Sequence, residues 1–558
     1  MSAEEHERTW DYIIVGAGSA GCVLARRLTE DPDVRVLLLE AGGRAPAWDW
    51  RIHMPAAFAY PMNSTTYNWD YHTVPQPNLG DRRMHTPRGR VLGGSSAING
   101  MAYVRGHPRD YDRWAEDPGL QHWSYRHCLP YFRRAEMRDL GPDDYHGGDG
   151  PQYVTTGRGW SPLYEAFIEA GQQAGYPYTA DMNGYQQEGF GPMQMTVRDG
   201  VRWSTWKGYL QPVLERENLD IVTRALTHRV TFEGNRASGI EYSRHGQVRH
   251  ARATRRVILA AGSIGSPQLL MLSGIGPADH LREHGIDVRA DLPGVGANLQ
   301  DHLELYVQQR CKQPVSLYPA VKPLNKVRIG MQWFLLHTGH GATNHFEAGG
   351  FIRSRPGVEH PDLQYHFLPM AVRYDGKSPI SDHGFQAHVG PMRSKSRGTV
   401  RLASNDPSKH PVIDPQYMSH PEDWEEMRAS IRLTREIFEQ EALAPYAAGE
   451  LAPGPDARSD KELDRFIAQA AESAYHPSCT CAMGSDREAV VDGDTAVHGV
   501  EGLNVVDSSI MPSIASGNLN APTIMVAEKA ADLIAGNEPL PPSDAPVWIH
   551  PEWQDKQR

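Results

Sequence analysis

The stretch Asp11-Tyr-Ile-Ile-Val-Gly-Ala-Gly-Ser-Ala-Gly21 decides the fold of the first part of this 558-residue chain. Its five leading residues form a short run rich in β-branched side chains, which is typical of a buried parallel strand. Glycines with the spacing G-x-G-x-x-G follow at once, and a helical pattern continues to Leu28. A second apolar run, Val34 to Leu39, leads to Glu40, about 20 residues after the last glycine. The order of strand, glycines, helix and acidic residue predicts a βαβ unit that binds a dinucleotide, rather than a merely structural glycine-rich turn.

Each glycine of this pattern, and the acidic residue after it, has a physical task. We expect Gly16 to allow the tight turn, Gly18 to let the backbone approach a pyrophosphate, and Gly21 to let helix and strand pack closely. The N–H groups and dipole of the helix N-terminus favour phosphate. Glu40 would accept hydrogen bonds from ribose hydroxyls, which favours an adenosine without a 2′-phosphate.

Composition excludes several classes of protein. A net charge of −12 with no compensating basic stretch argues against a nucleic-acid partner, and 13 Trp, 23 Tyr and 12 Phe argue against disorder. Five cysteines in so long a chain fit a reducing compartment better than a disulfide framework. The polar N-terminus lacks the pattern of a secretory signal, and no run of 18 apolar residues is present. We therefore expect a cytoplasmic location, with peripheral attachment to the inner face of a membrane left open.

Strand and helix patterns farther along the chain predict a composite fold. Arg256–Ala261 and Leu503–Val506 read as further strands of the first sheet, and Thr523–Ala535 as a helix ending at a glycine. The alternating segments Gln364–Met370 and Gly398–Leu402 favour antiparallel strands instead. Helical spacing also covers Glu422 to Glu441, and the Pro-rich end of the chain reads as irregular.

These patterns give the fold class: an α/β, Rossmann-like dinucleotide-binding domain interleaved with an α+β substrate domain built on an antiparallel sheet with helices. The expected limits are 11–155, 220–315 and 475–540 for the first domain, 156–219 and 316–474 for the second, and 541–558 for a C-terminal extension.

Two glycine-rich segments resemble the signatures of the glucose–methanol–choline (GMC) oxidoreductases, which are FAD-dependent alcohol-oxidising enzymes. They are Gly89-Arg-Val-Leu-Gly-Gly-Ser-Ser-Ala-Ile-Asn-Gly100 and Gly262-Ser-Ile-Gly-Ser-Pro-Gln-Leu-Leu-Met-Leu-Ser-Gly-Ile-Gly276. With the N-terminal glycines, His476-Pro and Asn518-Leu-Asn520, the resemblance extends from residue 11 to about 540. Within the family the chain is most similar to the bacterial choline dehydrogenases, on segments such as Leu299–Glu304 and Asn344–Ile352.

The resemblance implies a flavoenzyme that removes the hydroxyl proton of an alcohol and passes a hydride to flavin N5. His476 stands at the position of the family's catalytic histidine. Asn520 matches the second active-site position, which is His or Asn, although a helix N-cap is its alternative reading. The residues that the resemblance places against FAD are Gly16, Gly18, Ser19, Ala20, Gly21, Glu40, Trp69, Gly94, Asn99, Val230, Gly262 and Asp507. Ile98 stands where some relatives carry a histidine that tethers the flavin, so we expect FAD to be held without a covalent bond.

The favoured substrate is choline, oxidised to betaine aldehyde for glycine betaine synthesis. Glu304 matches a carboxylate aimed at the trimethylammonium group, His366 a histidine that orients the alcohol oxygen, and Tyr475 is a candidate aromatic face. One departure counts against choline: related enzymes have a Trp-Trp pair where this chain has Lys322-Pro-Leu324. Another aliphatic, aromatic or glycol alcohol is the alternative.

A zinc site, a nicotinamide-linked dehydrogenase and a non-catalytic flavoprotein fit the sequence less well. Cys479 and Cys481 near His476 lack the paired ligand sets of a zinc centre, so two buried thiols and no metal site are expected. A nicotinamide-linked dehydrogenase has no place for the two GMC signatures, and a non-catalytic flavoprotein would not need His476 and Asn520. The resemblance implies a membrane quinone or a dye as electron acceptor, with oxygen left open. The oligomeric state is also left open.

Overall fold

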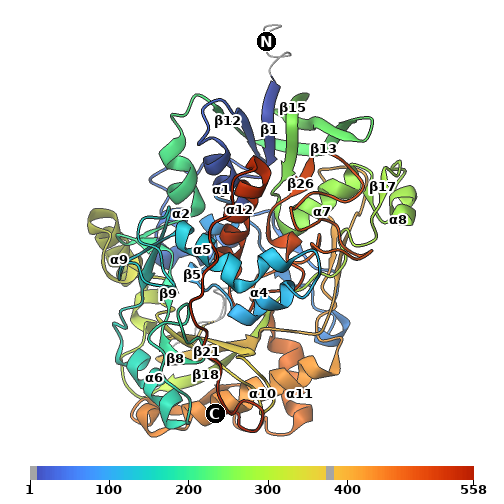
Figure 1. Ribbon diagram of the computed structural model, residues 1–558. Helices are drawn as coiled ribbons and strands as arrows, with labels where there is room; N and C mark the ends of the chain where they lie inside the picture. Colours follow the sequence, from blue (N-terminus) through green and yellow to red (C-terminus); the bar gives the residue numbers. More distant parts are fainter. Residues whose placement is uncertain (1–8, 373–381) are drawn as a thin grey trace.

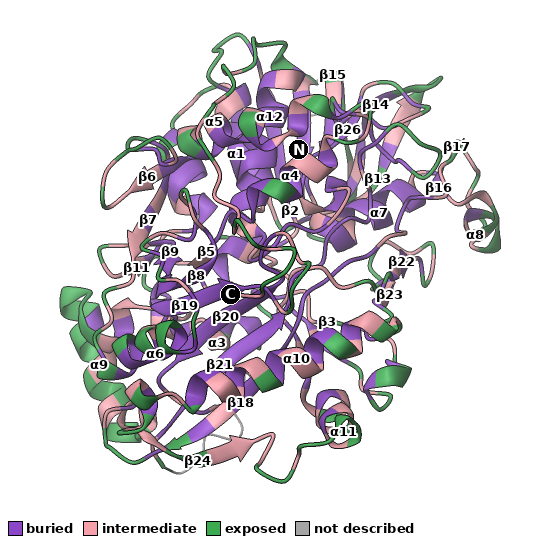
Figure 2. Cartoon of the chain, turned by 60° about the horizontal axis from the view of Figure 1, so that its bottom comes forward, coloured by how far each residue is buried: buried purple, intermediate pink, exposed green. Residues whose placement is uncertain are grey.

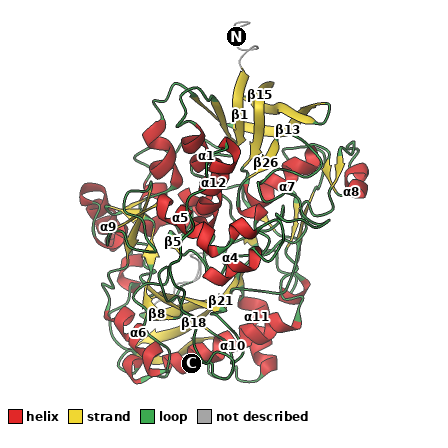
Figure 3. Ribbon diagram, viewed as in Figure 1, coloured by secondary structure: helices red, strands yellow, loops and turns green. Residues whose placement is uncertain are grey.

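The computed structural model describes residues 9–372 and 382–558. Figure 1 shows two large sheets, one near the N-terminus at the top and one at the bottom, and Figure 3 shows their strands as two yellow groups with helices around them. The first eight residues, on which the prediction about a secretory signal depends, lie outside the described residues.

The upper sheet is assembled from distant parts of the chain. Its strand order is β12 (Leu219–Thr223), β2 (Val36–Glu40), β1 (Thr9–Val15), β15 (Gln247–Leu259), β14 (Arg236–Arg244) and β13 (Ala225–Glu233), and β26 (Leu503–Val505) pairs with β15. The pairs from β12 to β15, and β15 with β26, are parallel, whereas β13, β14 and β15 are antiparallel. Strands β2 and β26 are fully buried, and β1 and β15 are buried in their last residues, up to Val15 and Leu259, as expected where helices cover a sheet.

A buried carboxylate ties three helices together beside this sheet. Helix α1 (Ser19–Leu28) and helix α5 (Tyr125–Ala135) both pack on α12 (Asn520–Ala535). Glu528 of α12 accepts hydrogen bonds from Arg27, from Arg134 and from the hydroxyl of Tyr209. Because donors from α1, α5 and residues 206–210 meet at one fully buried carboxylate, this network fixes how the helices pack.

The lower sheet is antiparallel throughout. Its strand order is β24 (Ala447–Ala452), β18 (Leu303–Cys311), β21 (Gly384–Pro391), β20 (Leu363–Leu368), β19 (Ala348–Ile352) and β8 (Gly189–Pro192), with β25 (Glu472–Ser473) on β18. One face is apolar and packs on α6 (Pro162–Gln173), α10 (Pro421–Phe438) and α11 (Asp460–Ala470). Figure 2 shows β20 and β21 buried, the edge strand β24 partly exposed, and the helices exposed on their outer side. Because side chains alternate along a strand, the even-numbered residues of β18, β20 and β21 face the other way.

Smaller elements complete the described chain. A four-stranded sheet contains β5 (Ala102–Tyr103), β9 (Gln194–Met195), β7 (Gln152–Thr156) and β6 (Glu136–Arg138). The two-stranded sheets are β3 (Tyr71–His72) with β4 (His85–Thr86), β10 (Val197–Arg198) with β11 (Val201–Arg202), β16 (Ile275–Gly276) with β17 (Ala290–Asp291), and β22 (Thr399–Arg401) with β23 (Val412–Asp414). The remaining α-helices are α2 (Trp50–His53), α3 (Ala59–Met62), α4 (Pro108–Trp114), α7 (Gly262–Leu272), α8 (Ala278–Glu283) and α9 (Pro323–Leu336).

The predicted fold class is confirmed: a Rossmann-like α/β unit is interleaved with an antiparallel sheet and its helices. One predicted limit differs from the sheet topology. The first domain was expected to include residues up to 315, but β18 is a strand of the lower sheet, so the chain changes sheet near residue 302. The other limits stay a proposal.

Candidate active site

A deep cavity lies where the two sheets meet, and both contribute residues to it. It is lined at one end by the turn between β1 and α1 and by Glu40, and at the other by residues of β18, β20 and the loop before Pro477. Most predicted site residues line it: Gly16, Gly18, Ser19, Ala20, Glu40, Trp69, Gly94, Asn99, Gly262, Glu304, His366, Tyr475, His476, Asp507 and Asn520. The fold therefore collects into one cavity residues that are up to 500 positions apart.

The turn before α1 has the properties of a pyrophosphate site. Gly18 is the N-cap of α1 and makes no side-chain capping bond, and the first turn of the helix contains no acidic residue. Gly16 has a φ of +103°, and a Cβ there would lie 2.5 Å from the carbonyl oxygen of Ala260. Gly94, in the first glycine-rich signature, approaches so closely that its Cβ would lie 2.6 Å from the Cα of Gly18. Bare backbone N–H groups at a helix N-terminus bind phosphate, so this end of the cavity fits the diphosphate of FAD.

Glu40 closes the same end of the cavity. Its carboxylate accepts hydrogen bonds from the main-chain N–H groups of Ala17 and Gly42, at 3.0 and 2.8 Å. Burial raises the pKa of Glu40 to about 7, against the lowering effect of those two N–H groups and of Arg90. Each carboxylate oxygen retains a lone pair that can accept from a ribose hydroxyl, as the sequence predicts.

Two residues predicted to contact the cofactor are not among the described residues that line the cavity. A Cβ on Gly21 would lie 1.8 Å from the carbonyl oxygen of Gly16, so this glycine serves the packing of α1 on β1. Val230 donates its N–H to the hydroxyl of Ser273 and lines a separate hollow, so its contact with the adenosine stays a prediction. Thr227, about 10 Å earlier along the same strand, lines the cavity instead.

Asp507 and Asn99 support the walls of the cavity. The carboxylate of Asp507 accepts from the N–H of Gly262 at 2.8 Å and from the hydroxyl of Ser266 at 2.6 Å, which fixes the start of α7. The side-chain oxygen of Asn99 accepts from the guanidinium of Arg202 at 2.8 Å. Both residues line the cavity, but these contacts show that they also organise the protein around it.

His476 is held in place by a buried carboxylate. Asp301 accepts hydrogen bonds from the main-chain N–H of His476 at 2.7 Å, from the hydroxyl of Ser473 at 2.6 Å and from Tyr417 at 2.5 Å. The chain reaches His476 through Tyr475, whose φ of +65° is uncommon for a bulky residue. Such backbone strain concentrates at functional sites, where surrounding bonds maintain it.

The hydrogen bonds around His476 determine which of its nitrogens carries the proton. His302 Nε2 lies 3.0 Å from the carbonyl oxygen of Met392, and because a carbonyl only accepts, this nitrogen must donate. Burial lowers the pKa of His302 to about 4, so the ring is neutral at pH 7 and its Nδ1 is an acceptor. His476 Nδ1, 3.1 Å away, therefore donates to His302, which leaves Nε2 of His476 unprotonated and able to accept a hydrogen bond.

The other side of His476 agrees with this assignment. The side-chain amide of Asn518 lies 3.1 Å from His476 Nε2, and its oxygen faces Gln364 and His366, both at 3.2 Å. The amide nitrogen of Gln364 can only donate, so the Asn518 oxygen is the acceptor and the Asn518 nitrogen donates to His476. The contacts through His302 and those through Asn518 thus both make Nε2 of His476 a hydrogen-bond acceptor.

His476 is also kept uncharged. Burial lowers its pKa well below the usual value, and His302, Arg88 and His366 add to this effect by repelling a second positive charge. A neutral imidazole with an unprotonated Nε2 beside a cavity is the form that can accept a proton from a substrate.

The prediction that Asn520 is the partner of His476 was wrong in position by two residues. Asn520 lines the cavity, but its side-chain oxygen accepts from the hydroxyl of Ser19 at 2.7 Å, which joins α12 to α1. The alternative of an N-cap does not hold either, because Asn520 is the first residue of α12 rather than its cap. The motif Asn518-Leu-Asn520 contains two asparagines, and spacing alone does not show which of them faces the histidine.

The lower sheet supplies the far wall of the cavity through its even-numbered residues. Glu304 on β18 and His366 on β20 line the cavity, and His388 on β21 lies between them, with its Nδ1 3.3 Å from the Glu304 carboxylate. Phe346 lines the cavity too, with its ring 5.8 Å from that of His366 and 5.3 Å from that of His388. Nothing in the sequence pattern distinguishes His388 or Phe346 from other residues of their type.

The departure at Lys322–Leu324 has no bearing on this wall. These residues precede or begin α9 and are not among the described residues that line the cavity. Leu324 is 86% exposed. The absence of a Trp-Trp pair at this position therefore does not count against a cationic substrate in the cavity.

Cysteines and possible metal ligands lie apart from this chemistry. Cys479 and Cys481 are both buried, as predicted, and burial raises the pKa of the Cys479 thiol to about 12.

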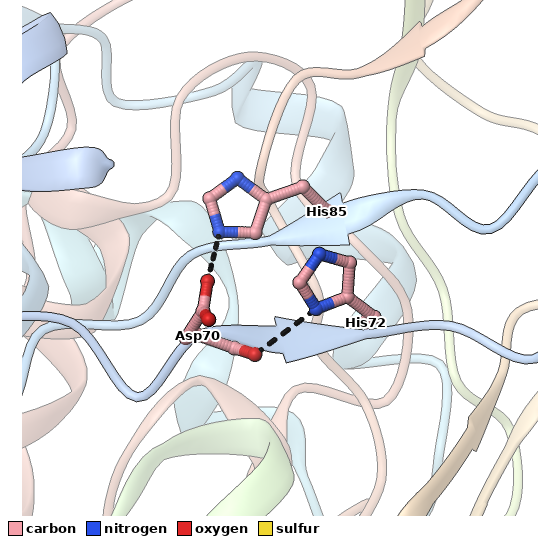
Figure 4. Close-up of side chains that lie close together, drawn as sticks. All are labelled: Asp70, His72 and His85. Atoms are coloured by element: carbon pink, nitrogen blue, oxygen red, sulfur yellow. Dashed lines mark hydrogen bonds and ion pairs between the residues drawn. The ribbon is translucent and has the colours of Figure 1, made fainter. Parts of the chain in front are cut away.

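Among the described residues, two other groups have three metal-type ligands close together: Asp70 with His72 and His85, and Asp143 with His146 and Asp181. Figure 4 shows the first group, in which His85 lies 3.1 Å from the Asp70 carboxylate and His72 donates to the Asp70 carbonyl oxygen. These contacts use one ring nitrogen of each histidine and one oxygen of the Asp70 carboxylate.

Two family models match the chain, both described as GMC oxidoreductase. The N-terminal model matches residues 10–304 and the C-terminal model matches residues 394–527. The chain is also similar to proteins named oxygen-dependent choline dehydrogenase. It is 58% identical over 544 residues to one from Burkholderia multivorans, covering 97% of this chain and 96% of the relative. The relative from Chromohalobacter salexigens is 58% identical over 546 residues, covering 97% of this chain and 98% of the relative.

Solved structures resemble the fold over nearly its whole length. Pyridoxine 4-oxidase from Mesorbium loti superposes with a TM-score of 0.86 at 33% identity, covering 95% of this chain and all of that one. A formate oxidase from Aspergillus oryzae RIB40, studied for FAD modification, gives a TM-score of 0.88 at 26% identity, covering 95% and 99%.

Proposed function

The chain belongs to the GMC oxidoreductase family, and on this basis we propose that it is an FAD-dependent dehydrogenase that oxidises choline to betaine aldehyde. The observation that carries the proposal is the partly buried, neutral His476, whose unprotonated Nε2 faces a cavity that also contains Glu304. The names of the relatives at 58% identity support the choice of choline.

The chemistry divides between the protein and the cofactor. Oxidation of a primary alcohol removes one proton from oxygen and one hydride from carbon. FAD, when bound, supplies the acceptor for that hydride. His476 accepts the hydroxyl proton at Nε2, and Nδ1 keeps its own proton against His302 as the imidazolium forms. Asn518 contacts Nε2 of His476, and His366 contacts Asn518. Both side chains therefore lie next to the base and can hold the alcohol oxygen by hydrogen bonds.

Recognition of choline requires groups that favour a cation without hydrogen bonds. A trimethylammonium group cannot donate, so it is attracted by a carboxylate and by the faces of aromatic rings. Glu304, with Phe346 and Tyr475 beside it in the cavity wall, offers this combination. His388, which contacts Glu304 and the ring of Phe346, holds both against the sheet.

The two electrons must then pass from the cofactor to an electron acceptor. We propose that oxygen or a quinone serves this purpose, and that an artificial dye can replace it in an assay. Oxygen is supported by the printed name of the relatives, and a quinone by the membrane surface argued below.

A substrate screen tests the proposal. The holoenzyme is mixed with choline, with the uncharged isostere 3,3-dimethylbutan-1-ol and with simple alcohols, and both dye reduction and oxygen consumption are followed. We expect choline to have the highest kcat/KM and betaine aldehyde to be the product. Preference for an uncharged alcohol would leave the family assignment intact and contradict the assignment of choline.

A further inference from the structure

Helix α9 is the most exposed apolar element among the described residues. Of its 14 residues, only Trp333 is buried. Six large apolar side chains are more than half exposed: Leu324, Val327, Met331, Phe334, Leu335 and Leu336. Figure 1 shows α9 projecting from the side of the molecule, and Figure 2 shows it exposed along its length. Single exposed apolar residues are common, but a contiguous group of this size marks a contact surface.

Four of the six exposed side chains form one stripe. Leu324, Val327, Met331 and Leu335 follow the spacing of three and four residues that places side chains on one face of a helix. Trp333 lies half a turn from this stripe and packs against Met54 and Ala57. Its indole nitrogen donates to the carbonyl oxygen of Gly200 at 2.7 Å. The helix is therefore anchored by one face and presents the other to the outside.

The charge around α9 is opposite to that of the whole protein. Although the chain carries a net charge of −12, no aspartate or glutamate occurs between Glu304 and Glu347. Lys322 is the N-cap of α9, Lys326 stands in the first turns on the side of Trp333, and Arg328 lies next to the apolar stripe. All three lie in exposed or partly exposed positions, and Lys322 contacts the ring of Tyr318. Basic side chains beside an exposed apolar face are typical of helices that lie in the interface of an anionic membrane.

We propose that α9 docks this protein onto the surface of an anionic lipid bilayer, with its apolar stripe in the headgroup region. Among the described residues, no helix is both long and apolar enough to cross a bilayer, so the contact is peripheral. A second copy of the chain fits the surface less well. A two-fold contact through α9 would place the same basic residues near one another with no acidic residue on the helix to pair with them.

The docking face is linked to the active-site cavity. Trp333 packs on Met54 and Ala57, and the next residue, Phe58, lines the cavity with its ring 5.9 Å from that of Phe346. A membrane under α9 would thus lie on the side of the molecule where Phe58 and Phe346 are found. Docking through α9 is independent of which alcohol the enzyme oxidises.

Vesicle flotation of the full-length holoenzyme tests the proposal. Phosphatidylcholine vesicles with about one third phosphatidylglycerol are compared with phosphatidylcholine alone, at low and high salt. We expect binding to the anionic vesicles that weakens at high salt. The triple variant Leu324→Ser, Met331→Ser, Leu335→Ser should lower the partition coefficient about tenfold or more. Lys326→Gln with Arg328→Gln should lower it roughly 25-fold, about fivefold for each charge.

Matched controls separate this contact from general surface effects. Leu140→Ser and Val248→Ser remove apolar side chains that are 66% and 59% exposed elsewhere, and they should leave vesicle binding unchanged. All variants should keep flavin absorbance and dye-linked activity, because none of these residues touches the cavity. Failure of the wild-type protein to bind anionic vesicles, or equal binding by the α9 variants, would overturn the proposal. So would sedimentation velocity showing a dimer that the triple serine variant dissolves without any vesicle binding.

Discussion

Replacing His302 by leucine should impair catalysis although His302 is not expected to touch the substrate. Leucine fills a similar volume but offers no acceptor to His476 Nδ1, which now lies 3.1 Å from His302 Nδ1. The buried Nδ1–H would lose its partner, at a cost of about 1–3 kcal/mol, or the proton would move to Nε2 and block the base. The expected loss in kcat/KM is therefore roughly 5- to 150-fold.

The pH dependence distinguishes this role from a merely structural one. His476 must be neutral to accept the proton, so kcat/KM falls as the pH drops through its pKa. His302 is one of the groups that lower this pKa, after burial, so the acid limb of the profile should move to higher pH in the variant. His302→Asn, whose side-chain oxygen can accept from Nδ1, should recover most of the activity and the original limb. A leucine variant with normal flavin content, unchanged kcat/KM and an unmoved acid limb would refute the reasoning.

Three further outcomes are expected. His476→Ala should retain flavin but lose roughly 10²–10⁴-fold in turnover, since a positioned base is gone; near-normal turnover in a flavin-replete sample would remove His476 from that role. Glu304→Gln should reduce the preference for choline over 3,3-dimethylbutan-1-ol about tenfold or more, because the carboxylate that attracts the cation is neutralised; an unchanged ratio of the two kcat/KM values would contradict it. Acid precipitation should release all of the yellow colour into the supernatant, because Ile98 at the cavity wall has no nucleophilic atom to hold the flavin; colour in the pellet would show a covalent link elsewhere.

The parts of the fold that local patterns specify were predictable. The β1–α1–β2 unit, the strands at Arg256 and Leu503 and the helix ending at Gly536 all follow from periodicity and from glycine positions. The antiparallel nature of β20 follows in the same way from its alternation. Local patterns do not show which distant strands pair. For this reason the predicted boundary at residue 315 lies beyond β18, which already belongs to the lower sheet.

The same limit applies to the active site. Gly16, Glu40 and His476 could be located because each is defined by its neighbours in sequence. Asn518 and His302 could not, because their roles depend on which atoms face His476 after folding. His302 belongs to the segment Leu299–Glu304, so the resemblance pointed to its neighbourhood without showing its contact.

The pairing of α12 with α1 has a consequence for how the protein is made. The apolar face of α1 is buried by a helix that begins at Asn520, and β15 is flanked by β26, which begins at Leu503. At about 5–20 residues per second, a ribosome needs roughly 25–100 s to proceed from the first strand to the last helix. Throughout that time the first βαβ unit exposes surface that only the end of the chain can cover, which favours aggregation. Synthesis of this protein should therefore depend on chaperones that shield the N-terminal unit, and a chain ending before Asn520 should remain bound to them.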